Sequence, residues 1–317
     1  MDFLPWVEKY RPKTIDDIIG HEQNIITIKK MLSNGSLPHL LFHGTPGTGK
    51  TSLILSIVEE IYGKSKNLMV MKLDASDDRG INSVREEIKG FAQKINMFHQ
   101  GIKLIILDEI DSMTFDAQFA LRRIIEKYSK TTRFCLICNY ENKIIPAIRS
   151  RCTNFRFGPI NMNYIKDKLT YICEKENLTY DTSVLDCISM ISKGDLRKSI
   201  NFLQSLSLQS NALSEKICYK IACIPSNEQI IYIINTLLNK DITYNEAHDV
   251  IDLLIKNEGY SLSIVMKELV SYLLNYKIDI DKLSLFMSEL SDLENRVSKS
   301  TFDDIYISAL VGIFKKN

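Results

Sequence analysis

The fold of this chain is decided by one stretch, His39-Leu-Leu-Phe-His-Gly-Thr-Pro-Gly-Thr-Gly-Lys-Thr-Ser52. Leu40 to Phe42 is a short apolar run, which is typical of a buried strand. Beyond the glycines, Leu53, Ile54 and Ile57 recur at helical spacing. A strand, a glycine-rich loop and a helix therefore follow one another without a gap.

The loop in this stretch matches the pattern G-x-x-x-x-G-K-[ST] at every position from Gly44 to Thr51. Its glycines permit positive φ, so that backbone N–H groups can converge on an anion at the helix N-terminus. Lys50 is expected to reach the β- and γ-phosphates of a nucleotide, and the Thr51 hydroxyl to ligate Mg²⁺. An ordinary glycine-rich turn is the alternative, and the complete match between strand and helix disfavours it. The predicted nucleotide-binding residues of the loop are Gly44, Thr45, Pro46, Gly47, Thr48, Gly49, Lys50, Thr51 and Ser52.

Acidic residues follow a second apolar run, Lys103-Leu-Ile-Ile-Leu-Asp-Glu109. At the end of a strand, Asp108 is expected to hold the Mg²⁺ through water, and Glu109 to polarise the attacking water. The alternative is a strand followed by a charged turn, which the phosphate-binding loop makes the weaker choice. A third apolar run, Phe134 to Cys138, ends at Asn139, whose amide could contact the γ-phosphate or position the water.

The order of the predicted elements gives the fold class, which is α/β followed by all-α. Strands alternate with helices over residues 36–158, which predicts a parallel sheet with helices on both faces. After Gly158-Pro159 the pattern is helical throughout, with a turn at residues 224–227. We therefore predict a nucleotide-binding domain at 1–158, a helical lid at 159–225 and a C-terminal helical domain at 226–317. Residues 230–238 are apolar all round, so they are expected to lie inside a bundle or against another chain.

The formal net charge of +1 over 317 residues excludes a global basic field, so any nucleic-acid binding must come from a local patch. The first five residues lack the basic and apolar regions of a signal peptide, and no apolar run approaches transmembrane length. These features predict an intracellular, soluble protein that does not bind membranes.

The seven cysteines are odd in number and scattered, which predicts reduced thiols. Cys135 and Cys138 form a C-x-x-C, but they lie within an apolar run and no second pair could complete a zinc site. We interpret both as small apolar residues of a strand.

Two basic residues, Arg85 and Lys89, lie one turn apart on a predicted helix, outside its apolar stripe. Their spacing alone favours a solvated surface pair. Alternatively, together with Arg79 and the helix N-terminus, they could hold the phosphates of a nucleic acid. Thr114 is expected to cap the helix that follows it.

Several motifs occur in an order typical of one family. They are Trp6-Val-Glu-Lys-Tyr-Arg-Pro12, Gly44-x-Pro-Gly-Thr-Gly-Lys-Thr51, Ala75-Ser-Asp-Asp-Arg-Gly-Ile81, Leu107-Asp-Glu109, Ala120-Leu-Arg-Arg123, Ser150-Arg-Cys152 and Gly194-Asp-Leu-Arg197. The chain resembles the small subunits of the replication factor C clamp loader, which are AAA+ ATPases. Residues 132–140 and 156–159 point to one type among those subunits. The resemblance implies ATP and Mg²⁺ as ligands, a helical lid and a C-terminal helical collar.

The resemblance also implies roles for single residues. Val7, Arg11 and Ile19 would line the adenine pocket. Asn139 resembles the sensor-1 residue, Arg197 the sensor-2 arginine, and Arg151 the arginine finger that acts in trans on a neighbour's ATP. The residues that would track DNA phosphates are Arg79, Arg85, Lys89 and Thr114. The sequence departs from the family at Ile110, where a small residue is usual, and at Thr45, where proline is common.

The function implied by the resemblance is that of an ATPase subunit in a heteropentameric clamp loader. It would open a sliding clamp of the PCNA type and load it onto primer–template DNA, for replication and repair. Its partners would be the other AAA+ subunits, the clamp, approached by Phe91 to Gly101, and the DNA. The alternatives are a ring subunit that binds ATP with little turnover, and a different AAA+ DNA remodeller. The chain would be nuclear in a eukaryote and cytoplasmic in an archaeon or a virus.

Overall fold

The computed structural model describes residues 4–76, 81–94, 101–209, 212–276, 278–300 and 304–316, without the side chains of 81–85. The chain divides into two compact units, Met1–Asn211 and Ala212–Asn317. Each has a hydrophobic core of its own. In the part of the chain described, no helix is both long and apolar enough to cross a membrane.

The first unit is built on a five-stranded sheet with the strand order β2-β3-β4-β1-β5, in which every pair of neighbours is parallel. Its strands are β1 (Leu40–Gly44), β2 (Val70–Asp74), β3 (Lys103–Asp108), β4 (Thr132–Cys138) and β5 (Thr153–Phe157). The parallel α/β class predicted from the sequence is thus confirmed. Strand β2 begins directly after the buried Met69, which ends the short helix α4 (Lys66–Met69).

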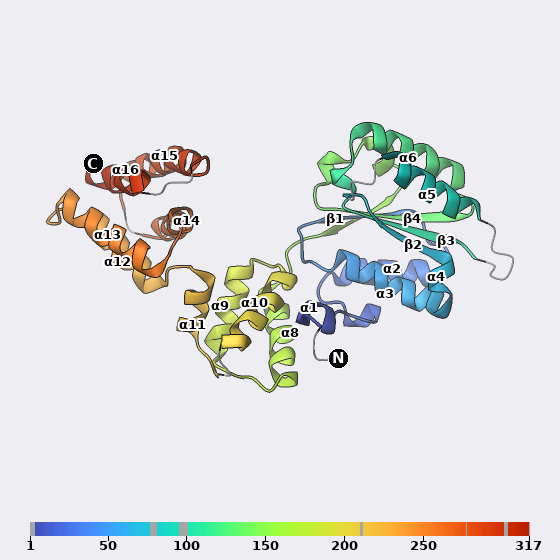
Figure 1. The fold of residues 1–317 in the computed structure, drawn as a ribbon, viewed down its shortest axis with the longest axis horizontal. Helices are drawn as coiled ribbons and strands as arrows, with labels where there is room; N and C mark the ends of the chain where they lie inside the picture. The colour runs from blue at the N-terminus through green and yellow to red at the C-terminus, as the bar shows by residue number, and fades with distance from the viewer. Residues whose placement is uncertain are drawn as a thin grey trace. The chain divides into compact units, whose positions relative to one another are not determined.

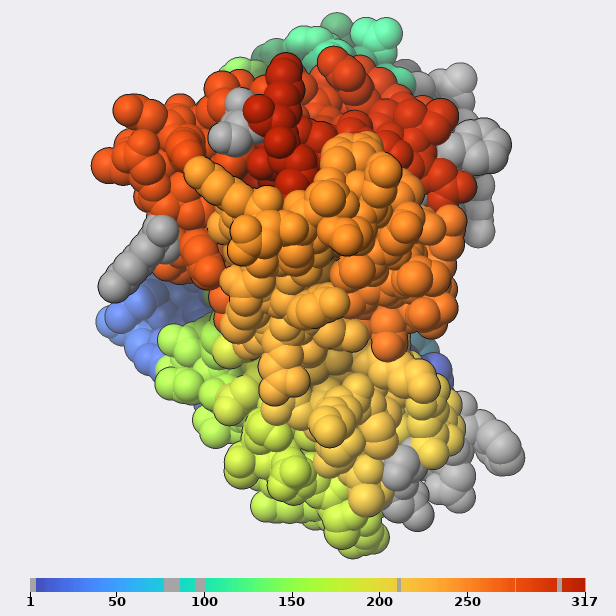
Figure 2. Space-filling model, turned by 90° about the vertical axis from the view of Figure 1, so that its left-hand side faces the viewer, coloured from blue at the N-terminus to red at the C-terminus, as the bar shows by residue number. Residues whose placement is uncertain are grey.

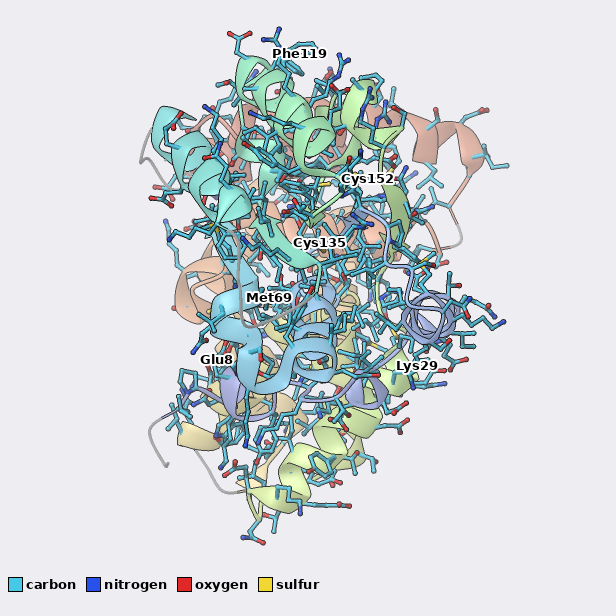
Figure 3. The ribbon with its side chains drawn as sticks, turned by 90° about the vertical axis from the view of Figure 1, so that its right-hand side faces the viewer. Glu8, Lys29, Met69, Phe119, Cys135 and Cys152 are labelled. Atoms are coloured by element: carbon cyan, nitrogen blue, oxygen red, sulfur yellow. The ribbon has the colours of Figure 1, made fainter. Side chains whose placement is uncertain are left out.

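Helices cover both faces of this sheet, with α2, α3 and α4 on one side and α5 and α6 on the other (Figure 1). The helices are α2 (Glu22–Ser33), α3 (Lys50–Tyr62), α5 (Ile81–Gln93), α6 (Phe115–Tyr128) and the short α7 (Pro146–Arg149). Successive strand side chains point to opposite faces. Leu40 and Phe42 therefore join the core under α3, whereas Leu41 joins the core under α6. Cys135 lies in the middle of the sheet (Figure 3) and is fully buried, as expected of a small apolar residue.

The parallel arrangement brings the carboxyl ends of the strands to one edge of the sheet. His43 pairs with Cys138, and Asp74 with Asp108. The phosphate-binding loop, Asp108 and Asn139 therefore emerge side by side. In open sheets of this kind ligands bind at such an edge, where the order of the strands reverses.

Helices α1 (Trp6–Lys9), α8 (Met162–Lys175), α9 (Thr182–Ser192) and α10 (Leu196–Gln209) complete the first unit, with the short strand β6 (Thr179–Tyr180). Four 3-10 turns connect the longer elements, namely η1 (Ile15–Asp17), η2 (Gly63–Ser65), η3 (Ile110–Ser112) and η4 (Glu141–Lys143). The N-terminal α1 packs on α10, where the Trp6 N–H donates to Gln204 Oε1 at 3.0 Å. The N-terminal segment is thus tied to the helix α10.

The second unit is helical, with an apolar core. It comprises β7 (Ala212–Leu213), α11 (Glu215–Ala222), α12 (Asn227–Leu238), α13 (Tyr244–Glu258), α14 (Leu262–Leu273), α15 (Ile280–Val297) and α16 (Asp304–Lys315). Its orange and red atoms pack closely on the face shown in Figure 2. Ile230, Ile233, Ile234 and Leu237 of α12 are buried in this bundle, whereas Tyr232 is exposed. Of the two alternatives for residues 230–238, burial inside a bundle is the one observed.

Candidate nucleotide-binding site

The phosphate-binding loop takes its shape from its glycines, and its carbonyls accept hydrogen bonds from the Lys50 ammonium. Gly44, Gly47 and Gly49 all have positive φ. Lys50 Nζ donates to the carbonyls of Gly44 at 2.7 Å and Thr45 at 2.8 Å, and to Asn139 Oδ1 at 3.1 Å. Burial lowers the pKa of Lys50 below its ordinary value, while the nearby Asp108 carboxylate opposes that shift. A phosphate would meet a cation that is desolvated and already oriented.

Oxygen ligands suited to a hard cation stand beside this lysine. Thr51 Oγ1 donates to Asp108 Oδ2 at 3.0 Å, and the Glu109 N–H donates to Asp108 Oδ1 at 3.1 Å. A hydroxyl and a carboxylate are the donors that Mg²⁺ prefers, so this pair fits the predicted metal site. Among the described residues no group of three or more His, Cys, Asp or Glu forms an all-protein metal site.

Glu109 has φ 54°, in the left-handed region that residues other than glycine rarely adopt. Strain of this kind persists where the surrounding structure enforces it, often at functional sites. Ile110 next to it is fully buried in η3, so the departure at this position is absorbed by packing under the sheet edge. Asp111 Oδ2 accepts the N–H groups of Asn139 and Tyr140 at 3.2 and 3.1 Å, which fixes the end of β4.

Most of the predicted nucleotide-binding residues line one pocket. Those at the pocket wall are Val7, Arg11, Ile19, Pro46, Gly47, Thr48, Gly49, Lys50, Thr51, Ser52, Asp108, Glu109, Asn139 and Arg197. Gly44 and Thr45 are not among the lining residues, and their carbonyls accept from Lys50. The structure therefore brings together an apolar end, formed by the N-terminal segment, and a phosphate end, formed by the sheet edge.

Arg151 lies elsewhere, on the surface beside α6. Its Nη2 is 2.5 Å from Glu126 Oε1, and its Nη1 donates to the Ala147 carbonyl at 2.6 Å. It is not among the residues lining the pocket. Its action on another subunit's nucleotide stays a prediction.

The four residues predicted to contact DNA are only partly described. Arg79 and the Arg85 side chain lie outside the described residues. Lys89 pairs with Glu86 at 2.7 Å on the surface of α5. Thr114 caps α6 as predicted, since its Oγ1 accepts the Ala117 N–H at 3.4 Å.

Several residues at the pocket escaped the sequence interpretation. Asp195 precedes α10 and packs against the Gly47 backbone, and the Leu196 N–H donates to the Gly47 carbonyl at 3.1 Å. Lys168 of α8 also lines the pocket, where burial lowers its pKa. The sequence feature that could have found Lys168 is its position next to the apolar stripe of Ile165 and Leu169. Nothing in the sequence indicates the contact of Asp195, because its partner is distant along the chain.

His21 is not among the residues that line the pocket. It precedes α2 with φ 57°, and its ring lies 4.9 Å from that of Phe157. Its Nε2 is buried without a hydrogen-bond partner among the described atoms, and burial lowers its pKa. The backbone of Thr48 in the phosphate-binding loop is nearby.

Comparisons with known proteins agree with this geometry. A model of the ATPase family associated with various cellular activities (AAA) matches residues 40–159. A model of the RCF1/5-like AAA+ ATPase lid domain matches 167–208, and one of the replication factor C C-terminal domain matches 225–312.

Related proteins match along nearly the whole chain. Probable replication factor C subunit 5 of Dictyostelium discoideum is 46% identical, covering 98% of this chain and 90% of that protein. Replication factor C subunit 5 of Mus musculus is 42% identical, over 98% and 92%, and subunit 3 of Saccharomyces cerevisiae is 39% identical, over 98% and 93%.

The chain belongs to the replication factor C family. The predicted class, an AAA+ ATPase subunit of a clamp loader, is therefore confirmed. Its motifs at 132–140 and 156–159 predicted the type numbered fifth in animals and third in budding yeast, in agreement with these relatives. Members of the AAA class bind nucleotide and, in this family, are parts of multi-subunit complexes.

Solved structures show the same fold in more distant proteins. The Thermotoga maritima RuvB Holliday junction branch migration motor aligns with a TM-score of 0.52 and 16% identity, over 80% of this chain and 88% of that one. A variant of the same protein aligns with a TM-score of 0.53 and 15% identity, over 82% and 91%. At that identity the likeness concerns the fold alone.

Proposed function

We propose that this chain hydrolyses ATP within a heteropentameric ring that opens a sliding clamp of the PCNA type and loads it onto primer–template DNA. The observation that carries the proposal is the convergence of Lys50, Thr51, Asp108 and Asn139 in one pocket of a chain from this family. The other AAA+ subunits, the clamp and the DNA are its proposed partners. The relatives are eukaryotic, which supports a nuclear location.

Each side chain of the pocket has a proposed role in binding or hydrolysing ATP. Lys50 Nζ binds the β- and γ-phosphate oxygens, exchanging its contacts with the loop carbonyls for them. Glu109 orients the attacking water and takes up its proton. Asn139 and Arg197 contact the γ-phosphate, and Val7, Arg11 and Ile19 enclose the adenine. Mg²⁺, held through Thr51 and Asp108, would supply charge neutralisation at the phosphates.

Arg151 is proposed to complete a neighbour's site rather than its own. A planar, permanently charged guanidinium suits the charge that develops in phosphoryl transfer. Hydrolysis by the isolated chain is therefore expected to be slow, because the finger for its own pocket belongs to another subunit.

The three predicted domains, 1–158, 159–225 and 226–317, and the role of the last as the collar of the ring are part of the same proposal. DNA contacts by Arg79, Arg85, Lys89 and Thr114 remain predictions, as does the approach of Phe91 to Gly101 to the clamp. The Lys89 ammonium would have to exchange Glu86 for a phosphate. Thr114 can still donate its hydroxyl hydrogen while it caps α6.

Affinity capture of the chain from its native source, with and without ATP, tests the proposal. We expect related AAA+ subunits in both samples, and a ring-shaped clamp only with ATP. The Lys50→Ala chain, captured with ATP, is expected to behave as the wild type does without it. Recovery of identical copies alone, with no clamp, would indicate a homomeric DNA motor instead.

A ring subunit that binds ATP with little turnover is the second candidate, because turnover at this pocket depends on a finger that another subunit would have to supply. Comparing the turnover of rings that contain Glu109→Gln with that of wild-type rings separates the two functions. Unchanged turnover would identify this site as structural.

A further inference from the structure

The finger Arg151 does not stand free on the surface of the first unit. Glu126 Oε1 receives Arg151 Nη2 at 2.5 Å and Arg122 Nε at 3.0 Å. The Ala147 carbonyl accepts Arg151 Nη1 at 2.6 Å. One carboxylate and one carbonyl thus hold the guanidinium from two sides.

Glu126 lies on a defined stripe of α6. Phe115, Phe119, Arg122 and Glu126 follow one another at intervals of three or four residues, so they share one face of the helix. Phe115 is 64% exposed and Phe119 50% exposed, and Phe119 points away from the sheet (Figure 3). Arg151 docks at the end of this stripe, on a face that the sheet does not cover.

The Glu126 carboxylate is shared by two arginines, Arg122 and Arg151. The hydrogen bond and the charge of Arg122, and after them the charge of Arg151, hold the pKa of Glu126 below its ordinary value. Arg122 neutralises part of the Glu126 charge, so Glu126 can keep its contact with Arg151 while other N–H groups of that guanidinium meet a phosphate. A carboxylate without that second arginine would compete with the phosphate for Arg151.

We propose that Glu126 is a positioning residue for Arg151, which orients the guanidinium before it reaches the nucleotide of the neighbouring subunit. An arginine side chain loses conformational entropy when it is fixed in one rotamer. Glu126 and the Ala147 carbonyl remove part of that cost in advance, so less is lost in the transition state. This inference rests on the proposed role of Arg151 in trans.

The test uses the assembled complex, in which this chain carries Glu126→Gln, Arg151→Ala or both. The first readout is ATP hydrolysis stimulated by DNA and clamp. The second is the rate at which the complex traps a fluorescent ADP with aluminium fluoride, which mimics the transferred phosphoryl group. Glu59→Gln is the matched control, because Glu59 is likewise an exposed helical carboxylate paired with a cation, Lys66.

We expect Glu126→Gln to lower both rates about two- to fivefold, the effect of an exposed ion pair on a barrier. In the Arg151→Ala background the same substitution is expected to add nothing, because Glu126 acts only through the finger. Glu59→Gln is expected to change neither rate. An unchanged or faster rate for Glu126→Gln would overturn the inference, and so would an additional loss in the double variant.

The outcome for Arg151→Ala distinguishes a failure of the proposed finger from a failure of the positioning role of Glu126. If that variant hydrolyses ATP as fast as the wild type, the proposed finger fails and Glu126 has nothing to position. If it is slow while Glu126→Gln is not, the finger stands and only the positioning role fails.

Discussion

The two compact units of the chain bury different kinds of side chain. The buried polar residues of the first unit include Thr48, Lys50, Lys103 and Gln118, and some of them lie at the nucleotide pocket. In the described part of the second unit, Thr236 is the one such residue, within a core of Ile, Leu, Val and Phe. Burying a polar group costs free energy unless it is bonded. The first unit carries part of that cost at the nucleotide pocket, through Thr48 and Lys50.

The largest effect we expect comes from the pair of buried lysines in the first unit. Lys50→Ala is expected to lower ATP hydrolysis at this chain's own site about 10²- to 10³-fold, because it removes a cation aimed at the phosphates. Lys103→Met is the control, since Lys103 Nζ donates to the Phe91 carbonyl at 2.7 Å, at the other end of the sheet. It is expected to cost about 1–3 kcal/mol of stability and to leave nucleotide binding unchanged.

ATP hydrolysis, nucleotide titration and urea unfolding of both variants would check this contrast. Equal loss of binding in the two variants would mean that buried lysines of the first unit matter for folding alone. The first unit would then not differ from the second in using its buried polar groups for chemistry.

In the second unit, the effect of a substitution on stability is expected to depend on the volume of buried side chain that is removed. Leu269 is fully buried on α14, so Leu269→Ala should destabilise the protein by about 2–5 kcal/mol through the lost contacts and the cavity. Leu253→Ala on α13 is the matched control, because that side chain is 58% exposed, and it should cost under about 0.5 kcal/mol. Urea unfolding measures both. A nucleotide affinity reduced by Leu269→Ala in the folded protein would contradict the separation of the units.

A smaller effect is expected where the lid meets the phosphate-binding loop. Gly47 and Gly35 both have positive φ, at 68° and 64°, but a Cβ on Gly47 would lie 1.7 Å from Asp195 Oδ1, whereas one on Gly35 would meet nothing within 4 Å. Asp195 Oδ1 also accepts the Lys198 N–H at 2.9 Å, so moving it costs α10 a cap. Gly47→Ala should therefore be less stable than Gly35→Ala by about 1 kcal/mol.

The double variant Gly47→Ala/Asp195→Ala sharpens this measurement. Without the Asp195 carboxylate, the added methyl should cost no more than it does at Gly35. If Gly47→Ala still costs more in that background, the contact with Asp195 is not the reason.

The smallest effect that we expect is on the pH dependence of stability in mild acid. Burial lowers the pKa of His39 to about 4, and its Nδ1 accepts the Phe134 N–H at 3.2 Å. Because the unfolded chain binds this proton more readily, stability is retained above about pH 6.5 and falls as the pH drops toward 4. His39→Gln should reduce that pH dependence by less than about 1 kcal/mol, since solvent still reaches the ring.

Urea unfolding of the wild type and His39→Gln at several values between pH 7 and pH 5 would measure the difference. Identical slopes against pH would show that the proton on His39 does not contribute to the stability of the first unit.

The sequence by itself determined the phosphate-binding loop, the alternation of strands and helices, and the family. These features are local, because glycine spacing, strand alternation and helical periodicity are set by neighbours along the chain. Lys50, Thr51 and Asp108 could thus be assigned to one site before their distances were known. The sequence left open whether residues 230–238 lie in a bundle or against another chain.

Only the tertiary structure decided the contacts between distant segments. It placed Asp195 on Gly47, buried the helix at 230–238 within its own bundle, and docked Arg151 on Glu126. The physical reason is that such contacts depend on how helices pack on the sheet and on one another. Periodicity gives the buried face of a helix, but it does not specify the residue that this face will meet.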